Sequence, residues 1–434
     1  MRRHNLGTLL AHLHHDGQLS RAALTERMGL NRSTIGGLVG ELVGLGAVQQ
    51  TAPAGGRTGA GRPSLDVRPS SEDVYVLAAE VGVDALRAAR VGLGGQLLAT
   101  ASGRTPPGRV PEEVAGALIG LLRDVTAEAP SGAALLGIGV GVPGVVRQDD
   151  GVIRFAPNLG WRDVPLAGLL RCGVRGALPI HVANDADLGA LAEHMRGAVT
   201  GQADVVFLAG DVGVGGGVIA GGRPLQGVGG YAGELGHLIV NPRGRTCRCG
   251  STGCWETEVG GPAISRALHL PAGDLDALAA RLAATRTPSA ALRRVGRYLG
   301  LGLGSIVNIL NPEVVVLGGV LRLLYPVVRE ATDEALATAA LVAPREQVRV
   351  VVPALGGDAV LVGAAERCFH AVLADPAREL AAACRDTSGA LDPQMSGAVG
   401  PSRSAPQART ATEPKAGAGR QAAPHAQPRA SVPA

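Results

Sequence analysis

Three of the six cysteines in this 434-residue chain fall within eight residues, at Cys247, Cys249 and Cys254. Nine residues separate His237 from the first of them. Three thiols and one imidazole form a complete four-ligand set of the soft type that binds zinc. With all four positions filled by protein, no position is left for a metal-bound water. The cluster therefore predicts a structural zinc site, and reduced surface cysteines without a metal are the alternative.

The composition limits the other chemistry available to the chain. Hydrophobic residues make up 46% and charged residues 18%, which is typical of a globular protein. Lys415 is the only lysine, so a P-loop and a Schiff-base lysine in the folded part are excluded. No signal peptide is evident, and no apolar run reaches the ~18 residues of a membrane span. We expect a cytoplasmic protein without a membrane partner, in which thiols stay reduced and serve as metal ligands.

The first 50 residues have the pattern of three helices. Leucines at positions 6, 9, 10 and 13 give the first helix one apolar face. Ser20 is expected to cap a second helix over 21–28, and Asn31 or Ser33 a third helix with Ile35, Leu38 and Leu42 inside. This spacing is that of a helix-turn-helix, whose second helix enters the major groove of DNA by its N-terminal end.

The residues expected to contact DNA lie on the third helix and in the loop "GRTGAGRPS" that follows it, which would form a wing. They are Arg32, Ser33, Thr34, Gly37, Arg57 and Arg62. Residues 1–71 hold eight arginines and four acidic residues, a balance of +4 that equals the net charge of the whole chain. Arginines of a wing would reach phosphates or a narrow minor groove. A three-helix protein–protein module is the alternative.

The rest of the chain indicates two α/β lobes and a tail. From residue 74, three apolar runs at hairpin spacing precede a helix over 111–129 and a strand over 135–142. A similar set starts near residue 204 and continues with a helix over 289–311 and the strand "EVVVLGG". This weak internal repeat predicts two lobes with a cleft between them. Residues 386–434 have almost no large apolar side chains, so we expect them to be a disordered tail.

Several motifs together resemble the ROK family of sugar-responsive repressors and sugar kinases. They are "GVGVPGVV", "APNLGW", "VANDADLGALAEH", "GDVGVGGGVIAGG", "GELGHL" and "CRCGSTGCWETEVGG". The resemblance covers about residues 74–374, and the segment before it resembles the winged helix of the repressor branch. It implies an α/β chain: a winged helix-turn-helix over 1–72, then a two-lobed actin-like ATPase (ribonuclease H-like) fold over 74–380.

The resemblance also assigns a sugar pocket. Asp185 matches the base that takes the proton from the sugar hydroxyl in the family's kinases. Asn184, Glu234, His237 and Glu256 match positions that hold the other hydroxyls, and the family's motif places a zinc beside the sugar. Such side chains suit a sugar, because it offers donors and acceptors in a fixed geometry. The sequence thus predicts that a fixed zinc loop holds Glu234 and Glu256 at the spacing of a sugar ring.

The departures from the family pattern lie in the phosphate loops. Glu80 stands where kinases of the family have Asp, and Val83 and Asp84 replace the glycine and the hydroxyl residue. Asp84 would repel a triphosphate, and Asp211 lies in the second loop. We therefore expect no catalytic residues, with Asp185 a vestigial base. These departures disfavour ATP binding, while the sugar pocket largely keeps the family pattern.

We expect a sugar-responsive DNA-binding transcriptional regulator, a repressor of carbohydrate metabolism genes. Its partners would be a double-stranded DNA operator and a monosaccharide or sugar-phosphate effector. Operator symmetry favours a homodimer, and the family resemblance implies a homodimer or homotetramer. An ATP-dependent sugar kinase with an added DNA-binding module is the alternative, and a protein-interaction scaffold with a relic pocket is a third interpretation.

Overall fold

The computed structural model describes residues 1–52, 65–271, 273–383, 385 and 391 of the chain. The expected wing residues Arg57 and Arg62 and almost all of the expected tail lie outside the described residues. In the part that is described, no helix is both long enough and apolar enough to cross a membrane.

The N-terminal segment forms the expected three helices and a small sheet. The helices are α1 (Arg2–Asp16), α2 (Arg21–Met28) and α3 (Arg32–Gly44). The antiparallel sheet has the order β1-β3-β2, with β1 (Leu19–Ser20), β3 (Asp66–Pro69) and β2 (Val48–Thr51). Ser20 caps α2, and of the two candidates for α3 it is Asn31 whose side chain accepts from the Thr34 N–H, at 2.8 Å. The caps therefore begin both helices where the sequence predicts.

The remainder holds two five-stranded sheets with the same strand order and direction. The first sheet runs β6 (Leu97–Arg104), β5 (Ala85–Gly92), β4 (Val74–Val81), β7 (Ala134–Val142), β11 (Ile180–Asn184). The second runs β14 (Arg223–Pro224), β13 (Val214–Ala220), β12 (Val205–Gly210), β15 (Val314–Gly319), β16 (Arg349–Val351). In each sheet the first three strands are antiparallel, and the last two run parallel to the middle strand. The predicted repeat is therefore confirmed.

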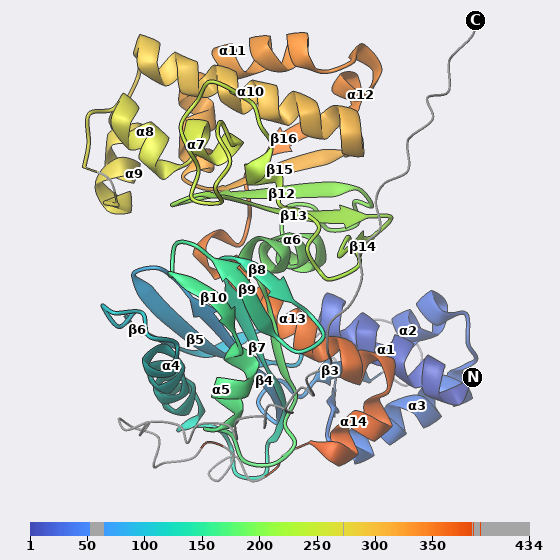
Figure 1. The fold of residues 1–434 in the computed structure, drawn as a ribbon. Coiled ribbons are helices and arrows are strands. Elements are labelled where there is room, and N and C mark those ends of the chain that lie inside the picture. Colours follow the sequence, from blue (N-terminus) through green and yellow to red (C-terminus); the bar gives the residue numbers. More distant parts are fainter. Residues whose placement is uncertain (53–64, 272, 384, 386–390, 392–434) are drawn as a thin grey trace, which may run out of the picture. The chain divides into compact units, whose positions relative to one another are not determined.

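Helices cover the sheets on both sides. On the first sheet α4 (Pro111–Thr126) packs on β5 and β6, and α5 (Leu166–Arg171) packs on β11. Next to β11 lies a small sheet of β8 (Val145–Arg147), β9 (Val152–Ala156) and β10 (Trp161–Val164). On the second sheet the long pair α10 (Ala290–Leu310) and α11 (Leu321–Ala339) forms the outer layer (Figure 1). The shorter helices are α7 (Trp255–Val259), α8 (Gly261–Ala267), α9 (Leu275–Ala284), α12 (Val342–Gln347) and α14 (Pro376–Ala382).

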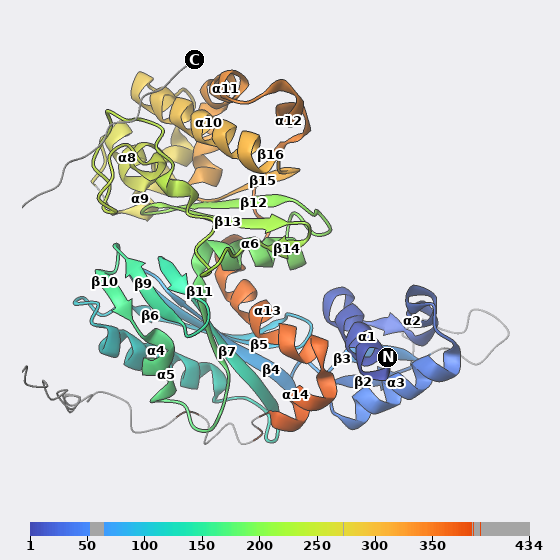
Figure 2. The same ribbon diagram turned by 45° about the vertical axis from the view of Figure 1, so that its right-hand side comes forward.

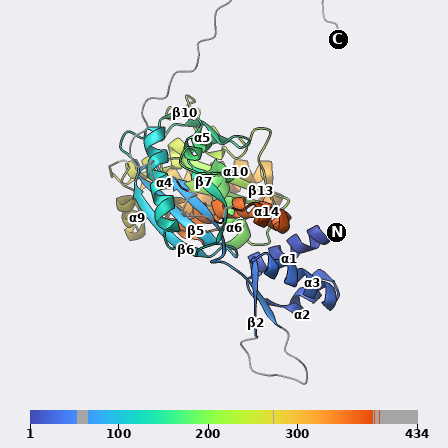
Figure 3. The same ribbon diagram turned by 90° about the horizontal axis from the view of Figure 1, so that it is seen from below.

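Two helices lie between the sheets and connect the lobes. Helix α6 (Asp185–Arg196) packs on β12 and β13 of the second sheet and on helix α13 (Ala359–Ala374). Helix α13 in turn packs on β4 and β7 of the first sheet and, at its far end, on α1 (Figure 2). Seen from below, α1, α2, α3 and β2 group together near α14 (Figure 3).

The N-terminal helices are packed into the core of the first lobe. Leu9 and Leu13 of α1, Ile35 and Leu42 of α3, and Phe369 of α13 belong to one continuous buried cluster. As the sequence predicts, Ile35, Leu38 and Leu42 of α3 face inward, while Arg32, Ser33 and Gly37 are exposed and Thr34 is half-buried. The N-terminal helices and α13 therefore share apolar contacts within one core.

Candidate functional site

The four predicted metal ligands come together. His237 ends the short helix η1 (Leu235–His237), and Cys254 precedes α7. One ligand atom from each of His237, Cys247, Cys249 and Cys254 lies within 4.8 Å of the others. The Cys249 and Cys254 sulfurs are 3.6 Å apart, and the Cys247 sulfur is 3.8 Å from His237 Nδ1. Tetrahedral zinc with Zn–S bonds of about 2.3 Å needs sulfurs about 3.8 Å apart, so the donor set fits zinc.

The thiols of this cluster contact one another and a neighbouring carboxylate. Burial raises the pKa of both the Cys247 and the Cys254 thiol. Cys247 Sγ donates to Glu256 Oε1 at 2.8 Å, so a protein carboxylate sits next to the cluster. A bound cation would replace the thiol protons, because only thiolates coordinate metal strongly. It would leave Glu256 free to accept a hydrogen bond from the cleft side.

A cavity of about 320 Å³ opens between the two sheets next to this cluster. Asp185, His237 and Glu256 line it, while Glu234 stands behind His237, with its Oε2 3.8 Å from His237 Nε2. His237 Nδ1 faces the thiols, and it is 4.0 Å from Glu256 Oε1. The imidazole thus stands between metal ligands and pocket, as the sequence predicts for a shared role.

Asn184 and Asp185 stand at the end of β11, where α6 begins. The Asn184 side chain caps α6, with Oδ1 accepting from the N–H groups of Ala186 (2.8 Å) and Asp187 (3.1 Å). Its Nδ2 donates to Gly144 O at 3.0 Å, so one amide N–H remains for a ligand. The cap places Asp185 in the first turn of α6, at the floor of the cavity.

Two carboxyl groups at the start of α6 have raised pKa values, and Asp185 is the one of them that lines the cavity. Burial, with Glu80 and Asp211 nearby, raises the pKa of Asp185 to about 7, against the pull of the Ala186 N–H. Burial, with Glu234 and Asp185, raises the pKa of Asp187 to about 8. Perturbed carboxyls in a cleft are typical of functional sites. A protonated carboxyl can donate to a sugar oxygen, and an ionised one can accept from a hydroxyl.

Sequence reasoning missed two residues of the cleft. Asn158 lines the cavity, and its Oδ1 accepts a hydrogen bond from Arg248 of the zinc loop. The motif "APNLGW" contains it, so the signal was present without a role attached to it. Arg87 is the other; it is one of two arginines in β5, and none of the motifs that carry the family resemblance contains it.

Arg87 occupies the side of the cleft where the phosphate loops meet. A second cavity of about 280 Å³ shares Glu80, Asp185 and Asp211 with the first and extends to Gly356 and Gly357. The Arg87 guanidinium donates to Glu80 at 3.3 Å, and it also contacts the Gly357 carbonyl and the Asp358 carboxylate. Burial raises the pKa of Glu80 in spite of Arg87. A triphosphate would have to displace this guanidinium and face the carboxylates.

Two sheets of one strand order around a shared cleft are the architecture of ROK proteins, and solved structures share it. A ROK family transcriptional regulator, described as a homolog of the E. coli MLC protein, superposes with a TM-score of 0.69 at 23% identity and covers 87% of this chain and 98% of that one. A ROK family glucokinase from Streptomyces griseus in complex with glucose and AMPPNP superposes with a TM-score of 0.58 at 28% identity. The match covers 68% of this chain and 98% of that chain.

The sequence comparison agrees with the fold. The model of the ROK family matches residues 76–368, and the chain belongs to the ROK family. The xylose repressor of Bacillus subtilis (strain 168) is 30% identical over 330 residues, which cover 75% of this chain and 84% of that protein. The family resemblance read from the motifs is thereby confirmed.

Proposed function

We propose that this chain is a sugar-responsive DNA-binding transcriptional regulator that represses carbohydrate-metabolism genes. The observation that carries the proposal is the position of α3. Its N-terminal end is capped and exposed, and its buried residues belong to the same core as α13 of the ROK domain. The likeness to a xylose repressor over three quarters of the chain supports it. In this proposal residues 1–72 bind DNA, residues 74–380 sense the sugar and residues 386–434 are a dispensable tail.

The DNA-binding surface would be the N-terminal end of α3 together with the wing. Arg32 and Ser33 are exposed there, and Thr34 lies beside them, so these three would reach base edges in the major groove. Gly37, one turn on, leaves room for close approach. Arg57 and Arg62 of the wing would bind phosphates. An operator with two half-sites would require a homodimer or homotetramer.

The effector site would be the cavity beside the zinc cluster. Asp185, His237 and Glu256 would bind hydroxyls directly, with Asn184 and Glu234 completing the ring of polar groups. A structural zinc on His237, Cys247, Cys249 and Cys254 would fix the loop that carries Glu256. It would supply no Lewis-acid step, because protein atoms fill the four positions of a structural site.

The alternative, an ATP-dependent sugar kinase, draws support from the likeness to a ROK glucokinase. The arrangement of Arg87, Glu80 and Asp358 argues against it, since it fills the phosphate side of the cleft with the chain's own charges. We therefore assign the chain no enzymatic activity in this proposal.

Fluorescence anisotropy with a labelled duplex from upstream of the chain's own gene tests the proposal. A thermal-shift screen of monosaccharides and their phosphates first finds the effector, because a ligand at 100 times its Kd stabilises by about 2.7 kcal/mol. We expect nanomolar binding that the effector changes, and at least a tenfold weaker Kd in Arg32→Ala. Arg297→Ala, an exposed arginine on α10, is the matched control. Equal binding by Arg32→Ala and the control would contradict the proposed surface.

A further inference from the structure

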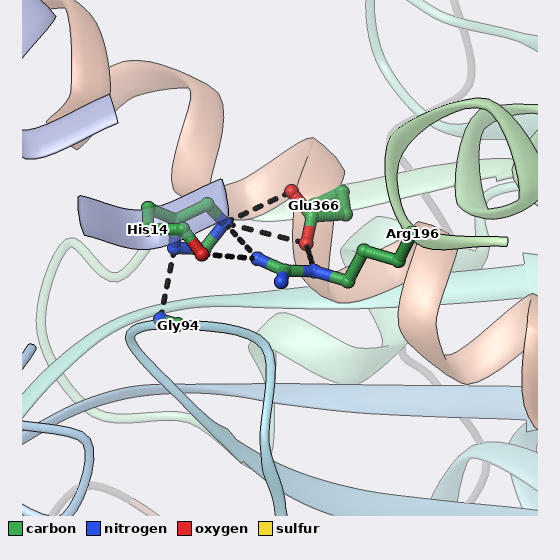
Figure 4. Close-up of polar contacts among 4 residues, drawn as sticks. All are labelled: His14, Gly94, Arg196 and Glu366. Atoms are coloured by element: carbon green, nitrogen blue, oxygen red, sulfur yellow. Dashed lines mark hydrogen bonds and ion pairs between the residues drawn. The ribbon is translucent and has the colours of Figure 1, made fainter. Parts of the chain in front are cut away.

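A buried polar cluster joins α1 of the N-terminal module to both helices that lie between the lobes. His14 of α1, Arg196 at the end of α6 and Glu366 of α13 meet there (Figure 4). His14 Nε2 lies 3.0 Å from Glu366 Oε2, and Arg196 donates to Glu366 and, at 3.0 Å, to the His14 carbonyl. The side chains of His14 and Glu366 are 0% and 2% exposed. We call these three residues the latch.

The charges of the latch are balanced internally. Although burial opposes it, hydrogen bonds from His14 and Arg196 lower the pKa of Glu366 to about 2, so Glu366 is an anion paired with Arg196. Burial lowers the pKa of His14. Its Nδ1 accepts from the Gly94 N–H at 2.9 Å, and its Nε2 lies 3.0 Å from Glu366 Oε2 and 2.7 Å from the Arg196 guanidinium. A metal on His14, His15 and Glu366 is disfavoured, because the guanidinium already holds the carboxylate.

The three helices also cross at glycines that bring backbone against backbone. A Cβ at Gly363 of α13 would overlap the carbonyl oxygen of Leu188 on α6. A Cβ at Gly7 of α1 would overlap the carbonyl oxygen of Leu373 on α13. Neither contact involves the flexible end of a side chain, so the backbones of the helices touch directly at both crossings. The latch and the two crossings thus make α6, α13 and α1 one mechanical unit.

One end of this unit is the sugar pocket and the other is the DNA-reading helix. Asn184 caps α6 and Asp185 is its first residue, while Arg196 is its last. Near that last turn the buried Glu193 accepts from the N–H groups of Ala354 and Leu355, which anchors α6 to the loop before α13. At the other end, Leu9 and Leu13 of α1 share a core with Ile35 of α3.

We propose that α6, α13 and α1, fastened by the latch and the crossings at Gly363 and Gly7, transmit sugar occupancy to α3. The inference rests on the proposed function and adds the route of its regulation. A sugar that draws the pocket closed pulls on Asp185 and the start of α6, and the unit then turns α1 and α3 together. Coupling of this kind is measured as the ratio of duplex Kd with and without sugar, typically 5- to 150-fold in allosteric proteins.

Two matched pairs of variants test the route in the full chain. Gly7→Ala pushes α1 off α13, and its control is Gly120→Ala on α4, where a Cβ meets nothing within 4 Å. Glu366→Gln removes the latch charge without changing its shape, and its control is the exposed Glu346→Gln on α12. The probes are the upstream duplex, measured by anisotropy, and the sugar found by the thermal-shift screen, measured by calorimetry. Hydrogen exchange of residues 2–16 with and without sugar is the second readout.

We expect wild type and both controls to show a coupling ratio of at least five and a sugar-dependent change in exchange of α1. In Gly7→Ala and Glu366→Gln the ratio should fall below two while sugar Kd stays within threefold, which shows the pocket is folded. Wild-type ratios in both variants would overturn the route alone. The route would also be overturned if sugar bound to the wild type without changing the hydrogen exchange of α1, even if a variant lost duplex binding. A wild-type chain that binds neither duplex nor sugar would contradict the proposed function and the route with it.

Discussion

Asp185→Asn should make the protein more stable while it removes sugar binding. The Asp185 carboxyl is buried, and Glu80 and Asp211 repel its charged form, which raises its pKa from 3.8 to about 7. An asparagine keeps the oxygen that accepts from the Ala186 N–H and carries no charge. The residue placed to bind a hydroxyl therefore destabilises the empty pocket, and its replacement relieves that cost.

The size of the effect follows from the pKa and depends on pH. Between the unfolded value of 3.8 and the folded value of about 7, the folded state binds more protons than the unfolded state. The free energy of unfolding therefore falls as the pH rises through this window, and the cost is complete above pH 7. At pH 8 about three pKa units at 1.36 kcal/mol each give a cost of up to about 4 kcal/mol. At pH 5 the same relation leaves about 2 kcal/mol.

Urea unfolding at pH 5 and pH 8 measures this difference. The two tryptophans, Trp161 in β10 and Trp255 in α7, are 3% and 0% exposed and report on one lobe each. Asp84→Asn is the control, because that carboxylate belongs to the same cleft but is 72% exposed. We expect Asp185→Asn to gain more at pH 8 than at pH 5 and the control to gain little at either. A loss of stability at pH 8, or an equal gain at both pH values, would refute the reasoning.

Three further predictions concern the metal, the nucleotide side and the wing. Freshly purified chain should contain about one zinc, and a metal analysis that finds no zinc would refute the site. Cys249→Ser should weaken the sugar response more than it lowers the helix content measured by circular dichroism. A coupled assay should detect no ATP-dependent phosphorylation of glucose, N-acetylglucosamine, mannose or fructose, and turnover at ordinary enzyme rates would show that Arg87 does not block the phosphates. Arg62→Ala should weaken duplex binding and reduce the slope of log K against log salt by about 1, and an unchanged slope would remove Arg62 from the phosphate contacts.

Much of the fold could be predicted because its signals are local. Ser20 and Asn31 begin α2 and α3 through their own hydrogen bonds, and the leucines of α1 repeat at helical spacing. The cysteine cluster could be predicted for the same reason, since three of its four members lie within eight residues. The duplicated sheet could be predicted in outline only, because strand order depends on pairings between distant segments.

The parts that could not be predicted depend on contacts between residues far apart in the chain. His14 and Glu366 are separated by 352 positions, and nothing near either residue in the sequence marks them as partners. Gly7 and Gly363 are two among 65 glycines, and only the crossing helices show why a side chain cannot stand there. That the Asn184 side-chain oxygen caps α6 likewise needed the geometry of the first turn of α6.

In the proposed function, Arg87 separates the nucleotide side of the cleft from the sugar side. Its guanidinium ties β5 of the first sheet to Asp358, in the segment between β16 and α13. On the nucleotide side Arg87 pairs with Glu80 and Asp358, and where the two cavities meet, burial raises the pKa of Asp185 to about 7. A ligand can shift an equilibrium only by its differential interaction with the two states. The sugar is the ligand with unsatisfied groups to bind, and the helix that begins among those groups is α6.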